Sequence, residues 1–202
     1  MAAAHGRTRF MSQLLGLAAV VIGLIGYAPY LWGMYYGRVR PHTFTWFLWG
    51  LLTAVAYAVQ VSDHAGAGSW VTGVTALICF GVTALAWHQS RFANVTRVDW
   101  YCLAAALTAI PMWWLTKTPL YSVLLIALID VLAYVPTFRK SWHHPRHEAV
   151  LTYLTSSLKF LLGIAALPEQ TFISSFYPWS VVITNVAFIL MVLYRRHVRK
   201  VA

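Results

Sequence analysis

Apolar residues gather along the chain in seven long runs, separated by short polar or turn-rich breaks. The breaks include Asp63-His64-Ala65-Gly66, Lys117-Thr118-Pro119 and Pro168-Glu169-Gln170. A helix needs about 20 mostly apolar residues to cross the core of a bilayer, and each run is close to that length. The pattern therefore predicts seven transmembrane helices, with no stretch left over for a soluble domain. We expect them over residues 12–36, 43–62, 69–88, 98–116, 119–139, 149–167 and 176–194.

The composition also favours a membrane protein. Hydrophobic residues make up 60% of the 202 positions and charged residues only 10%, and the mean hydropathy is +0.65. A soluble domain carries about 25% charged residues. We therefore expect one all-α integral membrane domain over residues 1–202.

The net charge of +10 is divided unevenly between the two predicted sides of the membrane. Arg7, Arg9 and Lys117 fall on one side, and Lys159 falls inside a span. The remaining basic residues share the other side: Arg38, Arg40, Arg91, Arg97, Arg139, Lys140, Arg146, Arg195, Arg196, Arg199 and Lys200. Because cytoplasmic loops are enriched in Lys and Arg, we expect a multi-pass protein of the cell membrane, with its N-terminus outside and its C-terminus in the cytoplasm. The basic residues then lie at the cytoplasmic surface of the lipid bilayer, where they can hold anionic headgroups. We expect no nucleic-acid partner.

The chain contains an internal repeat. Tyr27-x-Pro29 recurs as Tyr134-x-Pro136, and Trp70-x4-Thr75 recurs as Trp179-x4-Thr184, at nearly the same separation. The seven segments therefore divide into a first three-helix repeat, a linker helix and a second three-helix repeat. The linker restores the direction of the chain, so that the two bundles run parallel. The three parts cover residues 12–88, 98–116 and 119–194.

This plan, with a proline near the cytoplasmic end of helices one and five, resembles the PQ-loop/SWEET transporter superfamily. That group includes sugar-transporting SWEETs, half-size SemiSWEETs, cystinosin-like amino-acid exporters and the KDEL receptor. The chain departs from the pattern where Tyr30 and Thr137 replace the glutamine after each proline. The SWEET-type asparagine of the third helix is present only in the second half, as Asn185. The resemblance implies alternating access between the bundles, with Pro29 and Pro136 as hinges; static kinks are the alternative.

Asp130 and Lys159 are lone ionisable residues inside apolar runs. Placing either in the middle of a bilayer costs about 2.5–3.5 kcal/mol on insertion scales, so both should face the bundle interior and find partners. We expect them near the midplane on adjacent, antiparallel helices. They could form an ion pair that fixes the interface between helices five and six. Alternatively, Lys159 binds an anionic or hydroxyl-rich solute, while Asp130 accepts a proton or the lysine.

Further residues are predicted to line a central solute site. Trp46 and Trp49 share one face of the second helix, and with Tyr57 they could stack on a ring of the solute. Thr53, Ser157 and Asn185 are polar side chains within spans, where they bond either a neighbouring helix or the solute. The Trp46-x-x-Trp49 pair also resembles the PnuC vitamin transporters, which share the three-one-three plan.

These features predict a carrier of a small polar solute, sugar-like or another small metabolite. The alternatives are a non-transporting receptor or assembly factor with a SWEET-like fold, a PnuC-like vitamin transporter, and a retinal-binding protein. No nucleophile–base motif or phosphate-binding loop indicates an enzyme, and we expect no cofactor. The cluster His143-His144-x-x-His147 is interpreted as a solvated loop rather than a metal site. A homo-oligomer is left open.

Overall fold

The computed structural model of the chain describes residues 2–37, 43–90, 97–116, 118–143, 145 and 150–201. Within them the protein is all-helical, and each of the seven predicted spans falls on one α-helix. A short 3-10 helix, η1, precedes the third of them. In chain order the elements are α1 (Ala2–Tyr35), α2 (Thr43–Ser62), η1 (Gly66–Ser69), α3 (Trp70–Ser90), α4 (Arg97–Thr116), α5 (Leu120–His143), α6 (Val150–Ala165) and α7 (Phe172–Val201).

Four of these helices are long and apolar enough to cross a membrane, over Arg9–Tyr35, Thr43–Ser62, Gly66–Trp87 and Phe172–Val198. The other three, α4, α5 and α6, hold shorter apolar stretches. The first helix begins well before residue 12, where the span was expected to start. Alanine and arginine are good helix formers, so the basic N-terminal segment continues the helix although it is too polar for the bilayer core.

Large apolar side chains lie on the outside of the helices and many polar ones lie inside. Leu77, Leu151 and Ile183 are exposed by 71%, 71% and 63%, whereas Gln60 and Asn185 are buried. Water-soluble monomers rarely expose large apolar patches. Polar groups that face the interior and apolar groups that face outward are typical of helices in lipid, so the surface is consistent with a membrane protein.

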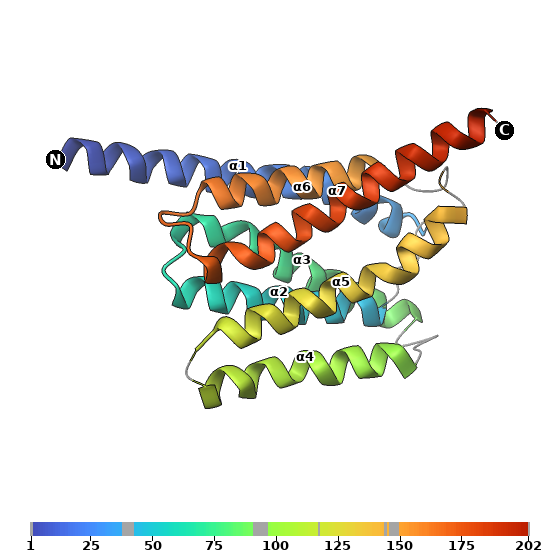
Figure 1. Cartoon of the computed structure of the whole chain (residues 1–202), viewed down its shortest axis with the longest axis horizontal. Coiled ribbons are helices and arrows are strands. Elements are labelled where there is room, and N and C mark those ends of the chain that lie inside the picture. Colours follow the sequence, from blue (N-terminus) through green and yellow to red (C-terminus); the bar gives the residue numbers. More distant parts are fainter. Residues whose placement is uncertain are drawn as a thin grey trace.

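Successive helices alternate in direction, and the two termini lie at opposite ends of the molecule (Figure 1). The helices α1, α3, α5 and α7 begin at the same end of the molecule, which we call the N-side. The opposite end is the C-side. α3 packs against both α1 and α2, and α7 packs against both α5 and α6. Across the molecule, α1 packs on α6 and α2 packs on α5, while α4 packs on α2 and α5. Among the described residues, neither α1 with α2 nor α5 with α6 forms a closely packed pair.

Two glycines bring η1 and α6 into close contact on the N-side. A Cβ atom added at Gly68 would lie 2.8 Å from the carbonyl oxygen of Gly163, and one added at Gly163 would lie 2.7 Å from Cγ1 of Val71. η1 begins at Gly66, which has a φ of 51°, a conformation that a residue without a Cβ adopts most easily. At this end, segments from the two parts of the chain therefore meet almost backbone to backbone.

Gly68→Ala should destabilise the protein, because its methyl group would overlap the backbone of α6. Overpacking of this kind costs about 1–3 kcal/mol. Thermal unfolding in detergent, followed by circular dichroism, measures the change. Gly81→Ala is the matched control, since a Cβ atom there meets nothing within 4 Å and alanine favours the helix. Equal loss of stability in both variants would contradict the close contact.

Candidate functional site

A cavity of about 320 Å³ lies inside the molecule and is lined by α1, α2, α3, α5, α6 and α7. No described residue of α4 lines it. Gly23 on α1 and Lys159 on α6 lie at its buried end, whereas Pro29 and Thr152 on the same two helices are exposed. Both exposed positions are closer to the C-side than their buried counterparts. The cavity is therefore deep toward the middle of the molecule and has its rim toward the C-side.

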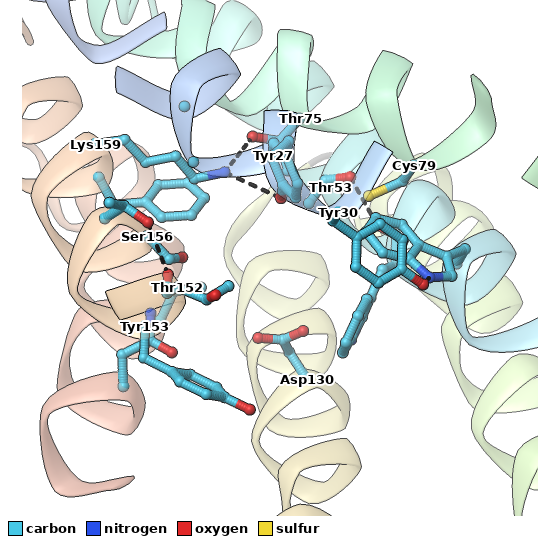
Figure 2. Close-up of a pocket in the computed structure, with 18 of the residues that line it drawn as sticks. Tyr27, Tyr30, Thr53, Thr75, Cys79, Asp130, Thr152, Tyr153, Ser156 and Lys159 are labelled. Carbon is cyan, nitrogen blue, oxygen red and sulfur yellow. Dashed lines mark hydrogen bonds between the residues drawn. The ribbon is translucent and has the colours of Figure 1, made fainter. Parts of the chain in front are cut away.

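Lys159 is almost fully buried and is held by residues of α1 and α3. Its Nζ donates hydrogen bonds to the Tyr27 hydroxyl at 3.2 Å and to Oγ1 of Thr75 at 2.9 Å (Figure 2). The same nitrogen lies 4.5 Å from the centroid of the Tyr27 ring, a cation–π contact. Gly23 makes room for this side chain, because a Cβ atom at Gly23 would lie 3.2 Å from Cδ of Lys159. The ammonium group is thus neighboured by neutral oxygens and rings.

Asp130 lines the same cavity and is only 5% exposed. Its carboxylate lies in the space between the helices, and no dashed line joins it to the hydrogen-bonded group around Lys159 (Figure 2). Among the described residues it has no hydrogen-bond or ion-pair partner. A buried carboxylate without a partner is costly, so either a proton or a bound molecule has to compensate it.

An ion pair between Asp130 and Lys159 was one of the two alternatives, and the structure does not contain it. The expectation that the two residues lie on adjacent helices was wrong, because α5 and α6 each pack against α7 rather than against each other. The helix that follows both of them in the chain lies between them. Lys159 instead finds its partners on α1 and α3, in the first part of the chain.

Aromatic side chains from α1 and α2 form one wall of the cavity. The Trp46 indole Nε1 donates a hydrogen bond to the Tyr30 hydroxyl at 2.9 Å, and the two ring centroids are 4.9 Å apart. Trp49 meets Trp46 edge to face at 5.7 Å, and Tyr27 meets Trp46 in the same way at 6.1 Å. Because the indole nitrogen already has a partner, this wall offers ring faces more than hydrogen bonds.

The rest of the lining comes from α5, α6 and α7, and it carries most of the polar groups beside apolar ones such as Phe160 and Val181. The Tyr134 hydroxyl donates to Oδ1 of Asn185 at 2.8 Å. The Nδ2 group of Asn185 is buried and has no hydrogen-bond partner among the described residues. Thr152 and Ser156 add hydroxyl groups from α6 (Figure 2).

The cavity brings together most of the residues that the sequence suggested. Of the predicted solute-binding residues, six line it: Trp46, Trp49, Thr53, Asp130, Lys159 and Asn185. Pro29, predicted as a hinge, lies at the rim. The side chain of Pro136, the second predicted hinge, lies outside the described residues, although α5 continues through its position.

Two predicted residues do not line the cavity. Tyr57 lies deeper on α2 than Thr53, and its ring packs over Gly73, where a Cβ atom would come within 2.9 Å of it. Ser157 is buried on α6 and donates its hydroxyl to the Tyr153 carbonyl oxygen at 2.9 Å. Residues 156 and 157 point about 100° apart on a helix, so Ser156 faces the cavity and Ser157 its flank.

Sequence reasoning missed several residues that line the cavity. Tyr27 and Tyr134 marked the repeat but were not assigned to the site, although each precedes a proline by two positions. Tyr30, Tyr153 and Cys79 carried no such signal. Repetition of a tyrosine at equivalent positions of both halves was the one available indication.

No protein-family model, no curated protein and no solved structure matches the chain. The cavity therefore has to be interpreted from its own chemistry. It offers a carboxylate, an ammonium group, an amide, hydroxyls and aromatic faces, which together are suited to binding a small polar molecule.

Thr75→Val should destabilise the protein, because it keeps the shape of the side chain but removes an acceptor from the buried ammonium of Lys159. A hydrogen bond to a charged group contributes about 1.5–3 kcal/mol. Chemical unfolding in detergent measures the difference. Thr83→Val is the matched control on the same helix. Each threonine donates to the carbonyl oxygen four residues earlier, Thr75 to Val71 at 2.7 Å and Thr83 to Cys79 at 2.8 Å. Thr75→Ser should restore stability, and equal effects of Thr75→Val and Thr83→Val would contradict the role of Thr75.

Proposed function

We propose that the protein is a seven-helix membrane carrier of the three-one-three plan, which moves a small polar solute by alternating access. The observation that carries the proposal is the cavity itself. It lies between two groups of three helices and holds two buried groups of opposite charge that do not neutralise each other. An ionisable residue in the interior of a membrane protein is a candidate for a transport pathway.

The contacts between helices support the division into two equivalent halves. We take α1, α2, η1 and α3 as the first half and α5, α6 and α7 as the second. Exchanging α1 with α5, α2 with α6 and α3 with α7 converts each pair of packed helices within one half into a pair within the other. The same exchange converts the contact of α1 with α6 into that of α5 with α2. α4 stands outside this relation, as a linker would.

Several contacts join the two halves on the N-side. Gln60 Nε2 donates to the Ser174 carbonyl oxygen at 2.8 Å, and the Thr171 hydroxyl donates to the Asp63 carboxylate. The Ser12 hydroxyl donates to the Ala166 carbonyl oxygen. Together with the close approach of Gly68 to α6, these bonds support a conformation in which the halves are closed on the N-side.

On the C-side, three hydrogen bonds each stay within one half. Trp46 bonds Tyr30 in the first half and Tyr134 bonds Asn185 in the second. Arg195 donates to the Trp142 carbonyl oxygen at 3.1 Å, again within the second half. With the exposed rim at Pro29 and Thr152, this supports an access path from the C-side, the side that the basic residues assign to the cytoplasm.

Pro29 is placed where a hinge would be useful. It lies inside α1 at the rim of the cavity, and a proline removes the hydrogen bond that a helix would otherwise make at its position. α1 touches both halves, since it packs on α3 and on α6. A small bend at Pro29 would alter the rim without separating the N-side contacts.

Counterflow uptake in proteoliposomes tests the carrier directly. We expect saturable uptake of one class from a labelled panel of sugars, amino acids and nucleosides. Asn185→Leu should reduce that uptake about tenfold or more, because it removes a buried amide from the cavity. Tyr57→Phe is the control, since Tyr57 lies outside the cavity. Specific binding without flux, in a protein that is demonstrably folded, would instead establish the receptor.

Cys79 offers a test of which side the cavity opens to. It lines the cavity and is 2% exposed. In a Cys102→Ala background, we expect a small membrane-impermeant thiol reagent to modify Cys79 faster from the C-side than from the N-side. Inside-out and right-side-out vesicles give the two rates, with orientation fixed independently by protease removal of a C-terminal tag. Faster modification from the N-side would contradict the proposed conformation.

A further inference from the structure

The cavity contains two charges of opposite sign, and no described residue supplies either of them with a counter-charge. Asp130 has no partner among the described residues, and Lys159 donates only to the hydroxyls of Tyr27 and Thr75. An ammonium group has three donor hydrogens, so one remains for a further acceptor. Charges buried in a low-dielectric interior need compensation, and here the cavity between them is where it can come from.

A neutral sugar does not meet this requirement well. Its hydroxyls could bond to both residues, but neither charge would be neutralised. A simple cation would serve Asp130 and leave Lys159 uncompensated, and a simple anion would do the reverse. A molecule that carries both charges satisfies both residues while adding no net charge to the interior.

Two further features describe the rest of such a molecule. The Nδ2 group of Asn185 is fully buried beside the cavity and has no partner among the described residues, so a small shift of the side chain would let it donate to an acceptor oxygen of the solute. The faces of Trp49 and Tyr30 on the opposite wall suit an apolar or aromatic body. At roughly 30 Å³ for each water, the 320 Å³ cavity holds about ten waters, or a solute of about ten non-hydrogen atoms.

We propose that the cavity binds a small zwitterion, whose cationic nitrogen meets the Asp130 carboxylate and whose anionic group meets the Lys159 ammonium. The amide of Asn185 donates to an oxygen of the same molecule, and its apolar part lies against the aromatic wall. This assignment rests on the proposed role of the cavity as a solute site and specifies the class of solute.

The test is calorimetric titration of the purified full-length protein in detergent with matched probes. Leucine and phenylalanine are zwitterions, 3-methylbutylamine and 2-phenylethylamine lack their carboxylates, and 4-methylpentanoate and 3-phenylpropanoate lack their amines. We expect a zwitterion to bind about tenfold to a hundredfold more tightly than either of its singly charged analogues, and glucose not to bind. Absence of binding by both zwitterions, or equal binding by an analogue or glucose, would overturn the assignment.

Charge-neutralising variants separate direct recognition from a structural role. Asp130→Asn should weaken the zwitterion about tenfold to a hundredfold but leave the acid analogue unchanged or bound more tightly. Lys159→Met should give the opposite preference, for the amine. Weakening of all probes alike would show a structural role and overturn the assignment. If Asp130→Asn does not fold, Asp130→Glu serves instead, because it keeps the charge. It should retain the preference for zwitterions. Tyr57→Phe is the control and should leave the binding of every probe unchanged.

The two proposals can fail separately. Zwitterion binding without uptake in proteoliposomes would support the ligand class while overturning the carrier. Uptake of a sugar or nucleoside, in a protein that binds no zwitterion, would support the carrier while overturning the ligand class.

Discussion

Compensation of buried polar groups is the constraint on which the arrangement of this bundle depends. The hydrocarbon core of a bilayer supplies no water, so each inward-facing polar atom needs a partner from the protein, from a bound molecule or from water in the cavity. Many are satisfied within their own helix, as when Thr53 bonds the Trp49 carbonyl oxygen at 2.6 Å. Lys159 is different, because its partners are on α1 and α3. Its position therefore ties a helix of one half to two helices of the other.

The two halves follow one plan but contribute different chemistry. Where the second half has Asp130, Lys159 and Asn185, the equivalent positions of the first half hold Gly23, Val55 and Ala76. The small residue at Gly23 is itself used, since it accommodates the lysine from the other half. On the proposed plan, the repeat thus provides the scaffold, and the differences between its copies provide a cavity with an aromatic wall and a wall that carries most of the polar groups.

Much of the fold could be predicted from the sequence, because apolar runs of the right length report helices directly. The inward-facing charges were equally visible, since Asp130 and Lys159 interrupt such runs. Their relation could not be predicted, because it depends on the order of helices in space, and the third helix of each half lies between the first two. Tyr57 was assigned to the cavity for a similar reason. Helical periodicity gives the face on which a residue lies, but the depth at which the cavity ends depends on how α2 packs against α3. Tyr30 gave no signal because its partner, Trp46, is on another helix.

The glycines that join η1 to α6 have a mechanical consequence. Helices usually interlock through ridges of side chains, which must be lifted out of their grooves before the helices can slide. At Gly68 and Gly163 the side chains of Leu167 and Val71 fill the space that a Cβ atom would take, so the contact is close on both sides. If the two halves rotate as proposed, they would do so about this contact, and the far end of each half would travel the greatest distance. In the proposed mechanism, this contact between η1 and α6 would be the pivot, and the C-side of the bundle would move the most.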